Sequence, residues 1–374
     1  PTQGSGQGLS WAGPRWTNTG SSISDIMAQH NTGMTFTDPT GEMTVNKRGD
    51  FFVDDTATGV SANNINDGST ILQHLQKDEQ KHALLLFATG HMLALYKCLF
   101  YLSVFKLSGT KFIHKTISES PGDIYIRPKH DGFVERIRRL EPNAAHKTLG
   151  CHLAINMDQT KQTEILTDII KRWVAKIRSS PLSPDDKLVA YKAYLEKMLL
   201  YILPTCSMTY QQCAKLDKLL SPILLHAHSI QSNFNRNVIY LSEDLGGLKI
   251  LSIFHLQGIS KLQFLFRHYR EMDTTGKLLV TSMRYTQLEL GISQPFLSTD
   301  FYQYTNIITP TWITNLWQYM CECNVQLHEC DPWIYKPPRD SDFFLMYKVY
   351  QSNIPDHHKE VFNRVRINMR LITA

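Results

Sequence analysis

The feature that most constrains the fold is a change in hydrophobic periodicity near residue 155. Before it, short apolar stretches alternate with turn-forming residues such as Asp38-Pro39-Thr40-Gly41. From Gln162 onward, apolar residues recur at helical spacing, with Ile165, Ile169 and Trp173 on one face. The sequence therefore predicts an α+β segment of about 155 residues followed by a mainly helical one.

Within these two segments the same patterns predict individual elements. In the first segment we expect helices over 10–30 and 70–89, a strand–turn–strand over 51–60, a hairpin pairing 99–105 with 110–114, and strands at 124–127 and 148–155. In the second we expect helices over 162–178, 187–203, 208–220 and 250–270, with weaker periodicity from 290 onward.

Composition is that of a globular protein large enough for two or three domains, with 374 residues, 42% of them hydrophobic. Seven irregularly spaced cysteines predict a reduced, intracellular protein of the cytoplasm or nucleus. The apolar stretch 83–105 includes Lys97, which is costly in a bilayer, so we expect a buried helix and strand and no membrane span. The chain starts at Pro1 without a signal peptide, and we expect it to be a fragment.

Charge is distributed unevenly along the chain. Residues 1–105 carry 6 Lys and Arg against 9 Asp and Glu, whereas residues 106–178 carry 14 against 8. A basic segment beside an acidic one fits a nucleic-acid track next to a metal site. A solvated surface of uneven charge is the alternative.

The run Phe52-Val53-Asp54-Asp55 is an apolar stretch that ends in two adjacent carboxylates. Neighbouring strand residues point to opposite faces, so two acids in succession suit a tight turn better than a strand interior. At such a turn the carboxylates can hold a divalent cation, although a solvated acidic turn is the simpler alternative.

Two further features flank this turn. Gln3-Gly4-Ser5 opens a glycine-rich loop, in which a ligand can approach the backbone closely, although such loops are often only flexible. Downstream, Gly90 and Lys97 bracket an apolar run before the expected hairpin. Lys97 can stabilise a ligand's negative charge or simply extend from a buried helix end into solvent.

The order of these features resembles the C-terminal part of the palm of a reverse transcriptase. The later Lys147-Thr148-Leu149-Gly150 and Leu245-Gly246-Gly247-Leu248 resemble segments of the enzymes of non-LTR (LINE-like) retrotransposons. The resemblance implies four regions: a partial palm (1–105), a primer-grip hairpin with connecting strands (99–155), a thumb-like helical region (156–290) and a C-terminal extension (291–374).

The resemblance also implies roles for residues. Asp54 and Asp55 would be catalytic metal ligands for Mg²⁺ or Mn²⁺, with two ions in the intact enzyme. Lys97 would lie near the pyrophosphate of a deoxynucleoside triphosphate. Gln3, Gly4 and Ser5 would lie beside the nascent base pair, and Phe52 would pack the strand or touch the primer end.

The family also needs an aspartate from a strand before the Gln-Gly-Ser loop, and this sequence starts at that loop. We therefore expect RNA-directed DNA synthesis in the intact protein and none from this chain alone. A non-catalytic nucleic-acid-binding remnant is the second hypothesis. An unrelated metal-binding protein is the third.

Two basic groups are expected to contact the phosphates of a primer–template: Arg136, Arg138 and Arg139, and, on a helix, Lys171 and Arg172. A solvated face is the alternative for each. Four potential zinc ligands occur at Cys321, Cys323, His328 and Cys330, but their spacing is tighter than that of common structural zinc sites. Helix-end cysteines are therefore the expectation. The pair His226 and His228 is expected to serve packing or a loop.

Overall fold

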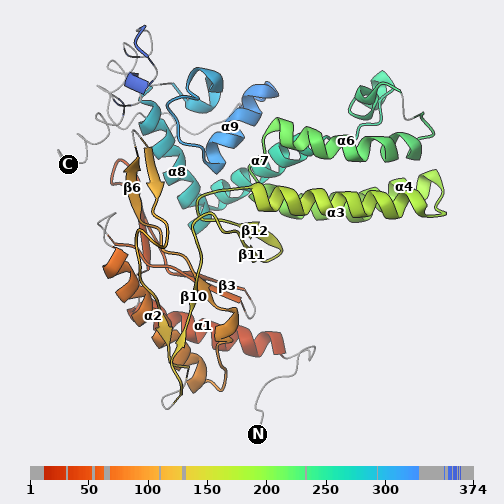
Figure 1. The fold of residues 1–374 in the computed structure, drawn as a ribbon. Helices are drawn as coiled ribbons and strands as arrows, with labels where there is room; N and C mark the ends of the chain where they lie inside the picture. Colours follow the sequence, from red (N-terminus) through yellow and green to blue (C-terminus); the bar gives the residue numbers. More distant parts are fainter. Residues whose placement is uncertain are drawn as a thin grey trace. The chain divides into compact units, whose positions relative to one another are not determined.

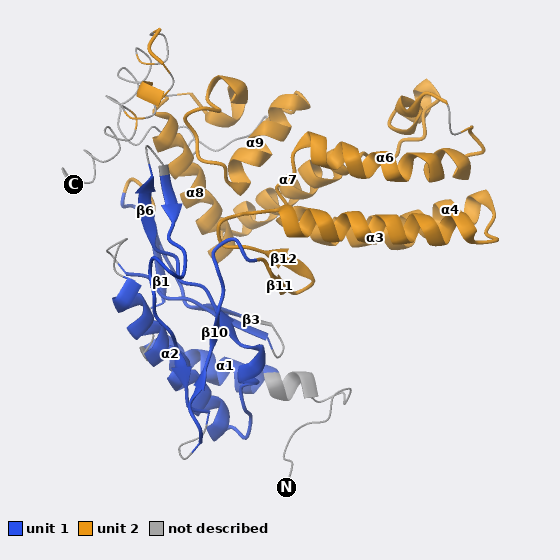
Figure 2. Ribbon diagram, viewed as in Figure 1, with its two compact units in different colours: residues 1–37, 41–144 blue, residues 38–40, 145–374 orange. Residues whose placement is uncertain are grey.

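The structure is a computed structural model, and its contacts divide the chain into two compact units (Figure 2). Unit 1 comprises Pro1–Thr37 and Gly41–Ala144, and unit 2 comprises Asp38–Thr40 and Ala145–Ala374. The structure describes residues 12–30, 33–52, 55–62, 68–108, 111–128, 132–231, 234–292, 294–327, 349, 353–355, 357–359, 361 and 363.

In the described part of unit 1, the long helices are α1 (Ala12–His30) and α2 (Gly68–Ala88), both labelled in Figure 1. The short helix η1 (Leu95–Lys97) follows them. Both long helices occur where the sequence predicts them. Pro14 falls in the first turn of α1, where its missing N–H leaves no helix hydrogen bond unmade. The helix α2 buries Leu75, Ala83 and Leu86.

The strands of unit 1 are short and form two-stranded pairs. They are β1 (Met34–Thr37), β2 (Thr44–Lys47), β3 (Gly49–Phe52), β4 (Asp55–Thr58), β5 (Leu99–Phe100), β6 (Phe105–Ser108), β7 (Lys111–His114), β8 (Tyr125–Ile126), β9 (Glu135–Arg136) and β10 (Arg138–Arg139). Successive strands pair antiparallel as β1–β2, β3–β4, β6–β7 and β8–β9, whereas β5 and β10 pair parallel.

The core of unit 1 explains why one predicted strand is divided. Leu102, Val104, Ile124 and Ile126 are at most 2% exposed and pack together with residues of α2. The expected strand 99–105 is therefore not the first strand of the hairpin: Leu99 and Phe100 pair with β10, and the following residues turn into the core. The hairpin itself uses Phe105–Ser108 and Lys111–His114.

Unit 2 is mainly helical. Its elements are the hairpin strands β11 (His146–Thr148) and β12 (Cys151–Leu153) and the helices α3 (Thr160–Ser179), α4 (Pro184–Ala190), the π-helical η2 (Tyr191–Glu196), α5 (Lys197–Ile202), η3 (Leu203–Thr205), α6 (Tyr210–Ala227), η4 (Arg236–Ile239), η5 (Glu243–Leu245), α7 (Ile253–Glu271), α8 (Thr274–Leu290), η6 (Phe296–Ser298), η7 (Phe301–Gln303) and α9 (Trp312–Glu322).

Local sequence signals explain where these helices begin. The Ser183 side chain accepts a hydrogen bond from the Asp186 backbone N–H, and Thr209 with Gln212 forms a capping box at the start of α6. The four helices predicted for this segment, over 162–178, 187–203, 208–220 and 250–270, are present. The second is interrupted by the π-helical η2, and the third continues through Pro222.

The predicted strand 148–155 is instead part of a hairpin. Leu149 and Gly150 lie between β11 and β12 with φ values of 48° and 88°, respectively. Two successive positive φ values are those of a type I′ turn, whose twist matches that of paired strands. The sequence Leu-Gly is thus the turn of a β-hairpin.

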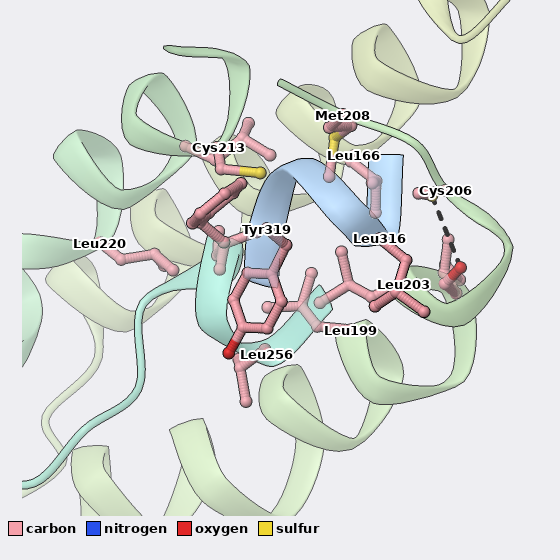
Figure 3. Packing of buried hydrophobic residues seen from close by; sticks show 14 of the residues in the cluster. Leu166, Leu199, Leu203, Cys206, Met208, Cys213, Leu220, Leu256, Leu316 and Tyr319 are labelled. Atoms are coloured by element: carbon pink, nitrogen blue, oxygen red, sulfur yellow. Dashed lines mark hydrogen bonds between the residues drawn. The ribbon is translucent and has the colours of Figure 1, made fainter. Parts of the chain in front are cut away.

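The core of unit 2 is formed by α3, α5, α6, α7 and α9 (Figure 3). Leu166, Leu199 and Leu316 are completely buried in it. Phe296 and Trp317, whose ring centroids are 5.3 Å apart, are also fully buried. Apart from Asp38–Thr40, the helical unit begins at Ala145. Residues of the expected extension 291–374, up to residue 327, pack into the same core. Among the described helices, none is long and apolar enough to cross a membrane.

Candidate metal and nucleic-acid site

The aspartate pair lies at a β-hairpin. Strands β3 and β4 pair antiparallel, and Phe52 is directly opposite Asp55, so only residues 53 and 54 separate the paired positions. This agrees with the strand–turn–strand predicted over 51–60. Asp55 is exposed at the first position of β4, whereas Val53, Asp54 and the Phe52 side chain are outside the described part of the molecule.

Asp55 is a suitable oxygen ligand, but among the described residues it is not part of a preformed cluster. Within the described part of the chain, the one group of three potential metal ligands that lie within 4.8 Å of one another is His268, Glu271 and Asp273 in unit 2. That group has a structural explanation. Asp273 caps α8 by accepting a 2.7 Å hydrogen bond from the Gly276 N–H, and its other oxygen contacts His268 Nδ1 at 2.7 Å.

Gln3, Gly4 and Ser5 lie outside the described residues, so their expected place beside a base pair stays a prediction.

Lys97 is exposed at the end of η1, with its ammonium 5.6 Å from the centroid of the Tyr96 ring. Two residues after the end of η1, Leu99 of β5 pairs in parallel with Arg138 of β10. Lys97 therefore belongs to the same unit as the predicted arginines and precedes the strand that pairs with two of them. Among the described residues Lys97 and Asp55 are not in contact, so their shared role in catalysis stays a prediction.

The three arginines of β9 and β10 differ in solvent exposure and in their hydrogen-bond partners. Arg136 is exposed and forms a 2.7 Å ion pair with Asp123, and Arg138 is exposed. Arg139 is half-buried, and its guanidinium donates to the backbone carbonyls of Ser120 at 2.7 Å and Gly122 at 3.1 Å. Arg136 and Arg138 are therefore suited to contact phosphate, whereas Arg139 mainly supports the fold of unit 1.

The hairpin β6–β7 exposes apolar side chains. It pairs Phe105–Ser108 with Lys111–His114, whereas the sequence predicts that 99–105 pairs with 110–114. Leu107 and Phe112 lie directly opposite each other and are 63% and 53% exposed, respectively. Phe105 and His114 continue the same face with ring centroids 4.5 Å apart. On the other face, Lys106 forms an ion pair with Glu119. An exposed apolar hairpin face of this kind is typical of a contact surface.

Lys171 and Arg172 are both exposed on α3, as are Lys176 and Arg178. The opposite side of α3 buries Leu166, Ile170 and Trp173, so amphipathicity fixes which side faces solvent. Lys171 also lines a polar depression of about 390 Å³ together with Asp168 and Gln212, where α3 and α6 run side by side (Figure 1). The structure thus makes these charges accessible to a polyanion.

The described cysteines are not assembled into a zinc site. Cys321 Sγ lies 3.3 Å from Asp300 Oδ1, and Cys323 Sγ lies 3.7 Å from His255 Nε2. Burial raises the pKa of both thiols. His328 and Cys330 are outside the described residues. At the end of α6, His226 is exposed and His228 is half-buried.

Two features of the structure were not predicted from the sequence. Tyr194 and Tyr201 are largely exposed on one continuous helical segment, and Lys261 is completely buried in unit 2. Helical periodicity marks the apolar face of a helix, but it does not distinguish an exposed tyrosine from a half-buried one or a buried lysine from a solvated one.

Comparison of the chain with protein-family models, with curated proteins and with solved structures found no match.

Proposed function

We propose that this chain is part of a reverse-transcriptase-type polymerase, contributing the aspartate hairpin, the primer-grip hairpin and thumb-like helices. The observation that carries the proposal is the β3–β4 hairpin, in which Phe52 is paired with an exposed Asp55. The same unit carries the exposed Lys97, Arg136 and Arg138. Carboxylates at a tight turn, with exposed cations in the same unit, suit a reaction on nucleotides.

The chemistry assigned to the residues is nucleotidyl transfer. Asp54 and Asp55 would hold Mg²⁺, which when bound lowers the pKa of the primer 3′-hydroxyl and neutralises phosphate charge. Carboxylate oxygens are the ligands that this ion prefers, so the donor chemistry of Asp55 fits. Lys97 would stabilise the negative charge of the departing pyrophosphate, and Arg136 and Arg138 would contact backbone phosphates.

Two clustered ions require more carboxylates than this hairpin supplies, since Asp55 belongs to no described ligand cluster. We therefore expect this chain by itself to bind primer–template without extending it. In the intact polymerase a further aspartate would complete the metal ligands. The alternative is a remnant that binds nucleic acid through its basic surfaces and has no catalytic role.

The experiment compares aspartate variants in the intact polymerase by Mg²⁺-dependent primer extension. Because Asp54 is expected to ligate metal directly, Asp54→Ala should reduce extension by more than about 100-fold; Asp55→Ala should reduce it by at least about 10-fold, the effect of losing an outer-shell partner. Asp50→Ala is the matched control, since Asp50 is on the same hairpin but pairs with Lys47 at 2.8 Å.

Four results decide between the hypotheses. Loss of extension with unchanged duplex binding supports the catalytic role of the pair. Unchanged extension in both Asp54→Ala and Asp55→Ala rejects it. An intact protein that binds primer–template but never extends it identifies the non-catalytic alternative, and extension by residues 1–374 alone would overturn the expected need for a further carboxylate.

A further inference from the structure

Two tyrosines and a lysine lie exposed on the continuous helical segment formed by η2 and α5. Tyr194 and Tyr201 are 65% and 61% exposed, respectively, and Lys197 is exposed between them. The segment is anchored by its opposite side, where Leu195 and Leu199 are completely buried. At about 1.5 Å of rise per residue, the two rings are separated by roughly 10 Å along the helix. We call Tyr194, Lys197 and Tyr201 the tyrosine strip.

The hairpin β11–β12 holds one end of this strip in place. The Tyr201 hydroxyl donates a 2.6 Å hydrogen bond to the Leu149 carbonyl, at the tip of the hairpin. A Cβ built on Gly150 would lie 3.5 Å from the Tyr201 ring, so the ring is in van der Waals range of the turn. Positive φ values at Leu149 and Gly150 fix the turn geometry. Tyr201 is therefore positioned by its hydroxyl while much of its ring stays accessible.

The base of the hairpin is also fixed within unit 2. The His152 backbone N–H donates a 2.6 Å hydrogen bond to Gln162 Oε1 on α3, and Cys151 is buried in the helical core. A ring held on a rigid support loses little conformational entropy when it binds a ligand. The strip is consequently preorganised for a planar partner.

The surroundings of the strip are basic. Lys147 is exposed on β11 and is paired across the hairpin with His152. Burial lowers the pKa of His152, and the nearby positive charges of Lys147, Lys161 and His146 lower it further. Lys161 forms an ion pair with Glu164 at 3.4 Å, whereas Lys147 on the hairpin and Lys197 in the strip are exposed cations. Exposed aromatic rings beside exposed cations match the bases and phosphates of one flexible strand.

We propose that the tyrosine strip and the β11–β12 hairpin bind single-stranded nucleic acid, with bases stacking on Tyr194 and Tyr201 and phosphates contacting Lys147 and Lys197. The proposal rests on the proposed function in that nucleic acid is the partner, but it concerns a surface separate from the predicted duplex contacts on α3. A duplex is excluded from stacking here because its bases are already stacked on one another.

The test measures fluorescence anisotropy of the full chain with three labelled probes: a single strand of about 15 nucleotides, an abasic strand of equal length, and a duplex. Stacking contributes about 1–3 kcal/mol per base, so Tyr201→Ala and Tyr194→Ala should each weaken single-strand binding about tenfold. Affinity for the abasic strand and the duplex should be unchanged. Tyr201→Phe, which keeps the ring, should retain most of the affinity.

A matched control is Tyr302→Ala. Tyr302 is 53% exposed elsewhere in unit 2, and its hydroxyl also has a partner, Glu322 at 2.5 Å, so this variant should bind like the parent protein. Among the described residues, Tyr194 forms no hydrogen bond with the hairpin, so Tyr194→Ala tests stacking even if Tyr201→Ala loosens the turn.

The outcomes separate this proposal from the proposed function. Unchanged single-strand affinity in both alanine variants overturns the strip and leaves duplex binding intact. An equal loss for the abasic strand, or a loss in Tyr201→Phe as large as in Tyr201→Ala, also overturns stacking. If the chain binds none of the three probes, both the tyrosine strip and the nucleic-acid function are overturned.

Discussion

At the scale of single residues, Lys261 shows how a charge can be held inside unit 2. Its ammonium donates hydrogen bonds to Asn315 Oδ1 at 2.6 Å and to Ser207 Oγ at 3.0 Å, and it lies 5.0 Å from the centroid of the Trp312 ring. The residue is completely buried, and burial lowers the pKa of the lysine to about 7. These contacts link α7 to α9 and to the segment before α6.

The depressed pKa makes the stability of the protein depend on pH. Between about pH 7 and the usual lysine pKa of about 10.4, the unfolded chain keeps the proton that the folded chain has lost. The free energy of unfolding should therefore rise with pH in this window, by about 2 kcal/mol between about pH 7 and about pH 9. The lysine stabilises least below pH 7, where the buried group must be charged.

Urea unfolding at several pH values, followed by tryptophan fluorescence, checks this. Lys261→Met should remove the rise, while Lys218→Met, at an exposed position of α6, should keep it. Parallel pH profiles for the two variants would contradict a buried, titrating Lys261.

At the scale of elements, the helices were predictable because each has a long apolar face and a recognisable start. Ser183 and Thr209 cap helices as their residue types suggest, and Trp173 and Ile177 face the core as their spacing indicates. Short strands were harder to predict. The parallel pair β5–β10 depends on a partner distant in sequence, which periodicity cannot identify. Burial of Leu102 and Val104 in the core makes the hairpin β6–β7 begin at Phe105, which the alternation of residues 99–105 does not indicate.

Close packing of two helices gives an element-scale prediction. A Cβ added to Gly258 on α7 would overlap the buried ring of Tyr319 on α9. Gly258→Ala should therefore lower the free energy of unfolding by about 1–3 kcal/mol, the usual cost of overpacking a core. Gly20→Ala on α1 is the matched control, because a Cβ there meets no atom within 4 Å.

Alanine at an unhindered helix position is more favourable than glycine by about 0.5–1 kcal/mol, so Gly20→Ala should stabilise the protein. Urea denaturation of both variants measures the two effects with opposite signs. Stabilisation by Gly258→Ala would show that α7 and α9 are not in close contact.

At the scale of the whole molecule, the sequence predicts the mixed and helical segments but places their boundary too late. The change in periodicity lies near 155, whereas unit 2 begins at Ala145 because the β11–β12 hairpin packs on the helical core. The candidate site was predictable in part. The hairpin at Asp55 follows from a local pattern, whereas the structural use of Arg139 depends on the carbonyls of Ser120 and Gly122.

The basic excess of residues 106–178 is also divided between the units. Arg136 and Arg138 are exposed in unit 1, and Lys171 and Arg172 are exposed in unit 2. Each unit thus presents cations that can contact phosphate independently of base sequence.

The most direct test of this account is the salt dependence of primer–template binding by the full chain. We predict nanomolar-to-micromolar binding at low salt that weakens steeply as salt rises, with the slope of log K against log salt reduced by about 1 for each contacting cation removed. Arg136→Gln with Arg138→Gln, and Lys171→Gln with Arg172→Gln, should each reduce the slope by about 2. Arg267→Gln, which replaces an exposed arginine on α7 outside both predicted basic groups, should leave it unchanged. Absence of binding at low salt, or a slope that none of these substitutions changes, would contradict the nucleic-acid function.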